Sequence, residues 1–274
     1  MDRAIPIDKQ VKYFLTTLNM KKYILSIVFG VLMVVTAAAQ EYKITKSTGR
    51  LEITEVNHVT IEGTTGSEII FVGRSNRDDD DDQRAKGLRA VSGAGLEDNT
   101  GLGLSVIDKG NVTEVRQLKK MDGPHITVKV PKGVTVAYAH TSPHGDEVEF
   151  KNFEGEIEVN SVHSGVQLNN VTGPINIKTV HGDIDASLGG ALKSVSIKST
   201  HGHIDVALPL TIKADLDLFT QFGEILVDPD FKLEIEKVGD MVRYDNKVKG
   251  KLNGGGLPIF LSSQHNSVYL RKKV

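Results

Sequence analysis

A nine-residue pattern of apolar and polar positions repeats through the middle of the chain. Each copy contains two apolar residues separated by one polar residue. The first apolar residues of successive copies lie 9, 9, 9, 11 and 9 positions apart, and the longer interval contains Gly189 and Gly190. The apolar pairs are Ile157 and Val159, Val166 and Leu168, Ile175 and Ile177, Ile184 and Ala186, Val195 and Ile197, and Ile204 and Val206.

Such alternation over four to five residues is typical of a strand that buries one face. A single unit cannot bury that face alone, so neighbouring units must stack. An up-and-down antiparallel sheet and a solenoid both allow stacking. The corners between these strands lack Asn-Gly and Asp-Gly hairpin pairs, and the pattern matches itself best at 18 to 20 residues, which favours the solenoid. We therefore predict an all-β, single-chain β-solenoid that is parallel β-helix-like, with two strands per coil.

Glycines mark the corners between the predicted strands. We expect them to provide turn conformations that are closed to other residues. The corner glycines are Gly155, Gly165, Gly173, Gly182 and Gly202.

The repeat fades toward both ends, as expected if less regular strands cap the solenoid. Residues 40–75 contain alternating segments that predict N-terminal strands leading into the solenoid. Residues 76–103 are rich in charge and glycine and predict a flexible acidic loop. Residues 104–274 are predicted to form the solenoid and its C-terminal cap.

The first part of the chain resembles a targeting segment. Lys21 and Lys22 precede an apolar run over residues 23–35, and small alanines follow up to Ala39. This order predicts a signal peptide over residues 20–39 with cleavage near Ala39. Residues 1–19 are then predicted to be a non-native upstream extension, and an uncleaved N-terminal anchor is the alternative.

The predicted location follows from the same segment. The apolar run is shorter than the roughly 20 residues that a membrane-spanning helix needs, and no second apolar segment follows. After signal removal we expect a protein that is not integral to the membrane. It would be extracytoplasmic: in the periplasm, at the outer-membrane surface or secreted.

Composition excludes several chemistries. Cysteine is absent, so disulfides, cysteine-ligated metals and thiol nucleophiles are unavailable. The net charge is −2 without a basic block, which gives no footprint for nucleic acid. Aromatic residues make up only 5% and tryptophan is absent, which is unfavourable for a sugar groove built on stacked rings. The GLGL at 101–104 lacks the third glycine and the following helix of a nucleotide site, so we expect no cofactor.

Three histidines share one position in the repeat. His163, His181 and His201 each stand three residues before the first apolar residue of the next strand, so they should form a column with a spacing of about 4.8 Å. Such a column could bind Zn, Cu or Ni, or respond to pH. A structural ladder that hydrogen-bonds the turns is favoured, because no cysteine and no fixed carboxylate completes a zinc site. His144 and His203 lie nearby but out of phase.

Two groups of acids are candidate sites. The run Asp78 to Asp82 lacks the alternating order of a calcium loop, so it indicates a solvated acidic loop. Asp183, Asp185 and Asp205 alternate along strands and could be the paired acids of a polysaccharide-cleaving solenoid. The favoured interpretation is the solvent face of an alternating strand.

The phrases TVHGDIDASL, STHGHIDVALP, ADLDLFTQFGEI and LNGGGLPIFLSSQHNSVYLRKK resemble the bacterial putative adhesin family (DUF4097, a domain of unknown function) over Glu41 to Val274. The Ala-Gln at the end of the signal resembles exported proteins of the Bacteroidetes group. The resemblance implies a β-solenoid in an extracytoplasmic protein with a proposed role in adhesion. The family supplies no established catalytic residues, and His203 departs from its usual aspartate.

Together these patterns predict an exported, non-catalytic β-solenoid that serves as an adhesin, a cell-envelope scaffold or an interaction module. Its macromolecular partner would lie in the cell envelope or on a surface. One alternative is a carbohydrate-active enzyme, which requires clustered acids, lysine or arginine and aromatic platforms within about 10 Å along one groove. The other is a metal-binding envelope protein that uses the histidine column.

Overall fold

The computed structural model describes residues 40–73, 87–121, 123–236 and 246–273, and all of them fall in one compact unit, Ala39–Val274. The predicted upstream extension, the signal peptide and the acidic run Asp78 to Asp82 lie outside the described residues. Within the described ranges every regular element is a strand, and no helix there is long and apolar enough to cross a membrane.

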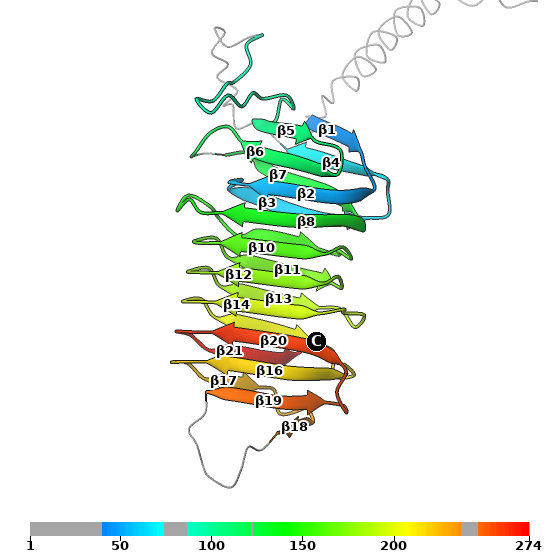
Figure 1. Cartoon of the computed structure of the whole chain (residues 1–274), viewed down its shortest axis with the longest axis vertical. Coiled ribbons are helices and arrows are strands. Elements are labelled where there is room, and N and C mark those ends of the chain that lie inside the picture. Colours follow the sequence, from blue (N-terminus) through cyan, green and yellow to red (C-terminus); the bar gives the residue numbers. More distant parts are fainter. Residues whose placement is uncertain (1–39, 74–86, 122, 237–245, 274) are drawn as a thin grey trace, which may run out of the picture. The chain divides into compact units, whose positions relative to one another are not determined.

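The strands form two sheets, which we name sheet A and sheet B (Figure 1). In spatial order, sheet A contains β1 (Gln40–Thr45), β4 (Glu68–Gly73), β7 (His125–Pro131), β3 (His58–Thr64), β9 (Val148–Lys151), β11 (Val166–Val171), β13 (Ile184–Leu188), β15 (Ile204–Leu208), β21 (Val268–Lys272) and β17 (Ile225–Val227). Sheet B contains β18 (Leu233–Ile235), β19 (Lys247–Leu252), β16 (Ala214–Thr220), β20 (Leu257–Ser263), β14 (Val195–Ser199), β12 (Ile175–Thr179), β10 (Ile157–Ser161), β8 (Gly133–His140), β2 (Thr48–Thr54), β6 (Val112–Gln117) and β5 (Leu104–Asp108).

The chain winds as a solenoid, which confirms the predicted fold. From β8 to β15 successive strands alternate between the two sheets, and each pairs in parallel with the strand one coil away. Ile157 on β10 lies opposite Ile175 on β12, and Ile184 on β13 lies opposite Ile204 on β15. The repeat of 18 to 20 residues is therefore one coil, and the nine-residue unit is half a coil.

The predicted apolar pairs fill the space between the sheets. All twelve of their side chains are buried, and the most exposed is Ala186 at 5%. Alternation makes this possible, because every second residue of a strand points inward. Burying one Val, Leu or Ile side chain contributes about 1.5–3 kcal/mol relative to leaving it exposed, so each coil adds several such contributions. The core is continuous from coil to coil.

Strands from the first and last parts of the described chain are interleaved with the stack, which the pattern of repeats did not predict. At the C-terminal end, β20 lies between β14 and β16, and β21 lies between β15 and β17 (Figure 1). At the N-terminal end, β2 lies between β6 and β8, and β3 lies between β7 and β9. The final strands, expected to be a cap, thus form an internal coil, as do two of the strands expected only to lead into the solenoid.

The interleaved coils are hydrogen-bonded on both sides. β16 follows β15 along the chain but does not pair with β14. Instead, β20 lies between β14 and β16 and pairs in parallel with both. The presence of β20 satisfies backbone groups of β14 and β16 that would otherwise be buried and unpaired. Antiparallel pairs then close the stack: β5 with β6 and β1 with β4 at one end, and β16 with β19 and β19 with β18 at the other.

Part of the segment predicted as an acidic loop falls within the described residues. Of residues 76–103 the structure describes 87–103, which are irregular apart from one bridge between Val91 and Glu97. The carboxylate of Asp98 accepts hydrogen bonds from three backbone N–H groups of the following turn. The same turn places Leu102 in the core with no exposed surface, so part of the segment contributes to packing.

Candidate functional site

Buried hydroxyl groups fix the corner that leads from sheet B to sheet A. The Oγ of Ser161 accepts a hydrogen bond from the N–H of Ser164 and donates one to its carbonyl, both at 2.9 Å. The Oγ1 of Thr179 donates to the Gly182 carbonyl at 2.8 Å, and the Oγ of Ser199 accepts from the Gly202 N–H at 2.9 Å. We call this column the hydroxyl ladder; its members are Ser161, Thr179, Ser199, Ser263 and Thr220.

The corner glycines have a different role from the one predicted. Gly182 and Gly202 do not adopt positive φ angles, so turn conformation does not explain them. A Cβ atom on Gly182 would lie 2.1 Å from the Ser164 carbonyl oxygen, and one on Gly202 would lie 2.1 Å from the Gly182 carbonyl oxygen. Glycine is needed because the backbones of neighbouring coils approach too closely for any side chain. None of the five corner glycines has a positive φ angle, so the prediction of special turn conformations was wrong at all of them.

The three predicted histidines do form a column, and two further rings extend it. The rings of His163 and His181 stack with centroids 5.4 Å apart, and those of His181 and His201 stack at 4.7 Å. His265 continues the stack 4.6 Å from His201, and Phe222 lies 5.0 Å beyond it. We call these five residues the ring ladder.

His265 and Phe222 were not predicted to join the column, because the strands that precede them lie outside the nine-residue repeat. His265 stands two residues after Ser263, as His201 stands two residues after Ser199. Phe222 has the same relation to Thr220. A search for a hydroxyl residue two positions before a ring would have found both residues. Their order in space, with His265 between His201 and Phe222, required the sheet topology.

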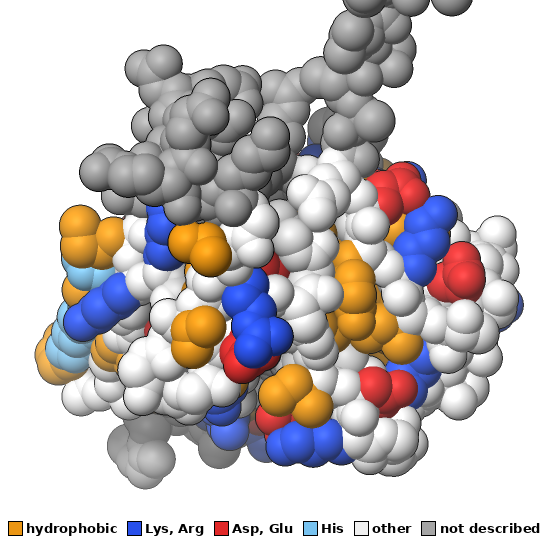
Figure 2. Space-filling model, turned by 90° about the horizontal axis from the view of Figure 1, so that it is seen from above, with side chains coloured by type: hydrophobic (Ala, Val, Ile, Leu, Met, Phe, Trp, Pro, Cys, Tyr) orange, Lys and Arg blue, Asp and Glu red, His pale blue; other side chains and the backbone are white. Residues whose placement is uncertain are grey.

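The ring ladder lies on the surface. All five side chains are exposed, and Phe222 is 67% exposed. Figure 2 shows histidine side chains gathered beside apolar ones at one edge of the molecule. Partial desolvation in the stack lowers the pKa of His201, and the nearby imidazoles of His265 and His181 lower it further. Among the described residues, the four imidazoles of the ladder contact rings and make no hydrogen bond or ion pair; the hydroxyl ladder bonds the turns.

Stacking is an unfavourable geometry for a shared metal ion. Zinc binds imidazole nitrogen at about 2.0–2.1 Å, and the nitrogen lone pairs must converge on the ion. The ladder planes differ by only 6° to 14°, so the lone pairs of adjacent rings lie in nearly parallel planes and do not converge between the stacked rings. In the part of the chain that the structure describes, no group of three or more His, Cys, Asp or Glu residues has the arrangement of a metal site.

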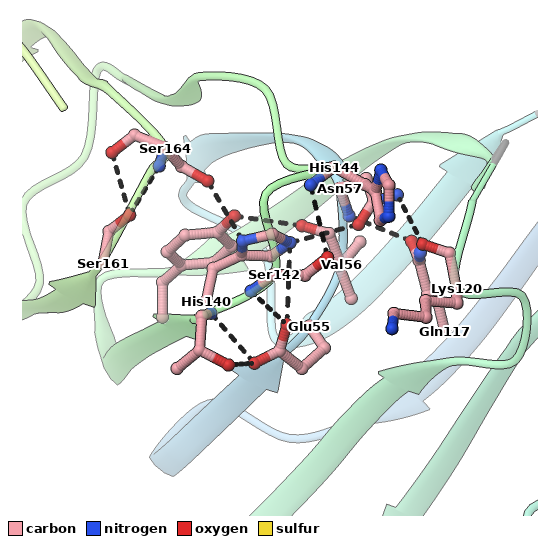
Figure 3. A network of polar contacts seen from close by, with 12 residues as sticks. Glu55, Val56, Asn57, Gln117, Lys120, His140, Ser142, His144, Ser161 and Ser164 are labelled. Atoms are coloured by element: carbon pink, nitrogen blue, oxygen red, sulfur yellow. Dashed lines mark hydrogen bonds and ion pairs between the residues drawn. The ribbon is translucent and has the colours of Figure 1, made fainter. Parts of the chain in front are cut away.

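A buried imidazole stands where the hydroxyl ladder meets the N-terminal coils (Figure 3). His140 lies opposite Ser161 in the sheet and has no exposed surface. Its Nδ1 lies 3.2 Å from the Ser164 Oγ, and its Nε2 lies 3.1 Å from the Asn57 Oδ1. Desolvation lowers the pKa of His140, although the Glu55 carboxylate 3.8 Å away acts in the opposite direction.

This network joins the interleaved first coil to the rest of the corner. Glu55, at a positive φ of 53°, accepts hydrogen bonds from the backbone N–H groups of Thr141 and Ser142. The buried phenol of Tyr138 donates to the Val56 carbonyl at 3.0 Å. These contacts hold the first coil against the neighbouring coil. His144 is exposed beside the network and lies outside the ring ladder, as predicted.

The acids predicted as a solvent face lie on sheet A in ion pairs. His203 contacts Asp183 at 2.9 Å and Asp185 at 3.2 Å. Arg271, from the interleaved last coil, contacts Asp205 at 2.7 Å. The three carboxylates are therefore engaged with cationic groups or with a histidine that can become cationic.

A second group of acids, not singled out in the sequence, lines a hollow of about 670 Å³ on the outer face of sheet B. Asp215, Asp217, Lys249 and Phe260 all border it, so the residue types required by the enzyme alternative meet at one place. Asp217 already pairs with Lys247 at 3.1 Å. The ammonium group of Lys198 lies over the Phe260 ring, 5.1 Å from its centroid.

Comparison with known proteins supports the resemblance seen in the sequence. Residues 144–240 match the family model Toastrack DUF4097. A putative cell adhesion protein from Clostridium sporogenes is similar at 12% identity and a TM-score of 0.43, covering 86% of this chain and 100% of that one. A putative adhesin from Bacteroides fragilis is similar at 9% identity and a TM-score of 0.31, covering 86% of this chain and 98% of that one. No curated protein matches the chain.

Proposed function

We propose that this chain, a member of the Toastrack (DUF4097) family in its residues 144–240, is an exported, non-catalytic β-solenoid that binds another macromolecule of the cell envelope through its ring-ladder corner. It would act as an adhesin or an envelope scaffold.

One observation carries this proposal: five stacked rings lie exposed in a single row along a rigid corner. Exposed rings and apolar side chains that form a contiguous patch are typical of interaction sites. The hydroxyl ladder beneath holds the corner in one conformation, so a partner would lose little affinity to ordering of the surface. Each ring belongs to a different coil, which makes the surface long and regular.

Binding to envelope material tests the proposal. A tagged chain from Gln40 to Val274 is incubated with washed cell envelopes, and the retained fraction is measured for wild type, His181→Ala/His201→Ala and the control His144→Ala. We expect the double variant to lose at least tenfold in apparent affinity and the control to match wild type. Equal retention of the double variant would refute a role for the ring ladder.

Export is tested separately. We expect the chain in its native host to be recovered outside the cytoplasm with Gln40 as its first residue, as cleavage near Ala39 requires. Fractionation and mass spectrometry of the N-terminal peptide measure this. Recovery in the cytoplasm with residues 20–39 intact would contradict export and leave the binding test unaffected.

A second candidate, a carbohydrate-active enzyme, is favoured by the acidic hollow on sheet B. If the hollow is catalytic, the wild-type chain should release reducing ends from envelope polysaccharide, and Asp217→Asn should abolish the release. The non-catalytic proposal predicts no release by either chain. Release by wild type alone would overturn it.

A further inference from the structure

A groove of about 440 Å³ lies on the outer face of sheet B beside the ring ladder. Its floor comes from equivalent positions on β10, β12, β14 and β20, so it crosses the strands and follows the direction in which the coils stack. Four strands at a spacing of about 4.8 Å give it a length of roughly 14 Å. The residues that line it include Asn160, Lys178, Lys198, Ser262, Thr200 and Gln264.

The charge of this groove is unbalanced. Lys178 and Lys198 line it together with polar and apolar residues, and no carboxylate lines it. The two lysines lie directly opposite each other on neighbouring parallel strands. Like charges in such positions destabilise a sheet. Across the described ranges neither ammonium group is in an ion pair, although Lys198 lies over the Phe260 ring.

A nearby carboxylate is unavailable to neutralise the lysines. Glu158, on β10, accepts two hydrogen bonds from the guanidinium group of Arg50, at 2.7 and 2.8 Å. Such bidentate pairs are among the stronger ion pairs in proteins. The positive charge of the groove is therefore left for an external anion.

The other lining groups suit an extended anionic ligand. Hydroxyl groups of Thr200 and Ser262 and side-chain amides of Asn160 and Gln264 can donate hydrogen bonds to sulfate or carboxylate oxygens. Because the groove crosses four coils, a linear polymer would meet one row of donors after another. We infer that this groove binds a linear anionic polysaccharide, an assignment that rests on the proposed envelope-binding function and names its ligand class.

Two other ligands fit the groove less well. Nucleic acid is bound by many phosphate contacts and by stacking of bases on aromatic rings, whereas this groove supplies two cations and no aromatic lining. A second copy of the chain would have to offer free carboxylates. The sheet A acids Asp183, Asp185 and Asp205 are already paired within their own copy.

Defined polymers test the assignment. The chain from Gln40 to Val274 is titrated with dextran sulfate, polygalacturonate and unmodified dextran of matched length. We expect both anionic polymers to bind, with affinity that falls as salt rises, and unmodified dextran not to bind. Lys178→Gln/Lys198→Gln should weaken binding of the anionic polymers at least tenfold. The control Lys129→Gln/Lys132→Gln removes the same charge from exposed positions on and just after β7, outside both the groove and the acidic hollow, and should change affinity less than twofold.

The outcomes separate this inference from the proposed function. Equal weakening by both double variants would show binding by net charge alone and overturn the assignment. Equal binding of neutral dextran would also overturn it. So would tighter binding of duplex DNA, titrated in the same way. Salt-dependent dimerisation lost in Lys178→Gln/Lys198→Gln would instead identify a second copy as the occupant. If the anionic polymers fail to bind while envelopes still retain wild type and not the ring-ladder variant, the polysaccharide assignment fails and the proposed function stands. Unchanged melting temperatures would show that both double variants are folded.

Discussion

The close approach of neighbouring coils at the corners predicts a large penalty for adding one methyl group. In Gly182→Ala the new Cβ would lie 2.1 Å from the Ser164 carbonyl oxygen, whereas ordinary contact begins at 3.4 Å. Relieving the overlap requires a movement of 3.4 − 2.1 = 1.3 Å between two backbones. The same movement would stretch the hydrogen bond from the His181 N–H to the Val162 carbonyl from 2.8 Å to about 4.1 Å, beyond bonding distance.

These two effects set the expected magnitude. Overpacking costs about 1–3 kcal/mol, and a lost backbone hydrogen bond costs about 1 kcal/mol. We expect Gly182→Ala to lower the free energy of unfolding by about 3 kcal/mol. For a chain of this size that corresponds to a fall in melting temperature of roughly 6–12 °C.

The chain offers a matched control for this substitution. A Cβ on Gly190 would meet no atom within 4 Å, so Gly190→Ala should change stability by less than about 0.5 kcal/mol. Urea unfolding followed by circular dichroism measures both variants against wild type. Equal midpoints for Gly182→Ala and Gly190→Ala would refute the explanation of the corner glycines as points of coil contact.

Further predictions concern the buried imidazole, the ring ladder and the ion pair on sheet B. Desolvation holds the folded pKa of His140 below its unfolded value of about 6.5. Its neutral form therefore supports stability above pH 6.5, and this support is lost as pH falls toward the folded pKa. Urea unfolding at pH 7.5 and 5.5 should show a smaller loss in His140→Gln than in wild type; an equal loss would contradict the assignment. Calorimetric titration with zinc, nickel and copper should give no heat above buffer, whereas heat that disappears in His181→Ala would establish a metal site. Arg50→Ala should cost about 1 kcal/mol at low salt and less at high salt, because its partner Glu158 is partly solvated; a cost independent of salt would mean that packing dominates.

Local patterns predicted the coil itself. The apolar alternation around Ile184 and Ile204 predicted two strands and their buried faces, and the spacing between the two residues predicted the length of one coil. These features were predictable because they depend on residues close together in the sequence. The position of His181 in the repeat likewise placed it in a column with His163 and His201.

The rest depended on contacts between distant parts of the chain. No local signal places the strand that contains Ser262 between two coils that precede it in sequence. For that reason the sequence did not predict His265 in the ring ladder or Ser262 and Gln264 in the groove. The burial of His140 was equally hidden, because it results from packing against Asn57, 83 residues away.

The interleaved last coil is the central structural claim, because it completes both the ring ladder and the groove. The chain contains no cysteine, so a pair of engineered cysteines reports only on the distance between those two positions. Tyr269 on β21 lies opposite Asp205 on β15 and, on its other side, opposite Leu226 on β17. Opposite residues on adjacent strands have Cα atoms about 4.8 Å apart, within the range of a disulfide. Asp205 and Leu226 are separated by two strand spacings, about 9.6 Å, which is beyond that range.

Oxidation of two double variants measures this arrangement directly. Asp205→Cys/Tyr269→Cys should form an intramolecular disulfide under mild oxidant, and Asp205→Cys/Leu226→Cys should remain reduced in the folded chain, as read by thiol labelling and mass spectrometry. A disulfide in the second variant and none in the first would place β17 beside β15 and contradict the interleaved coil.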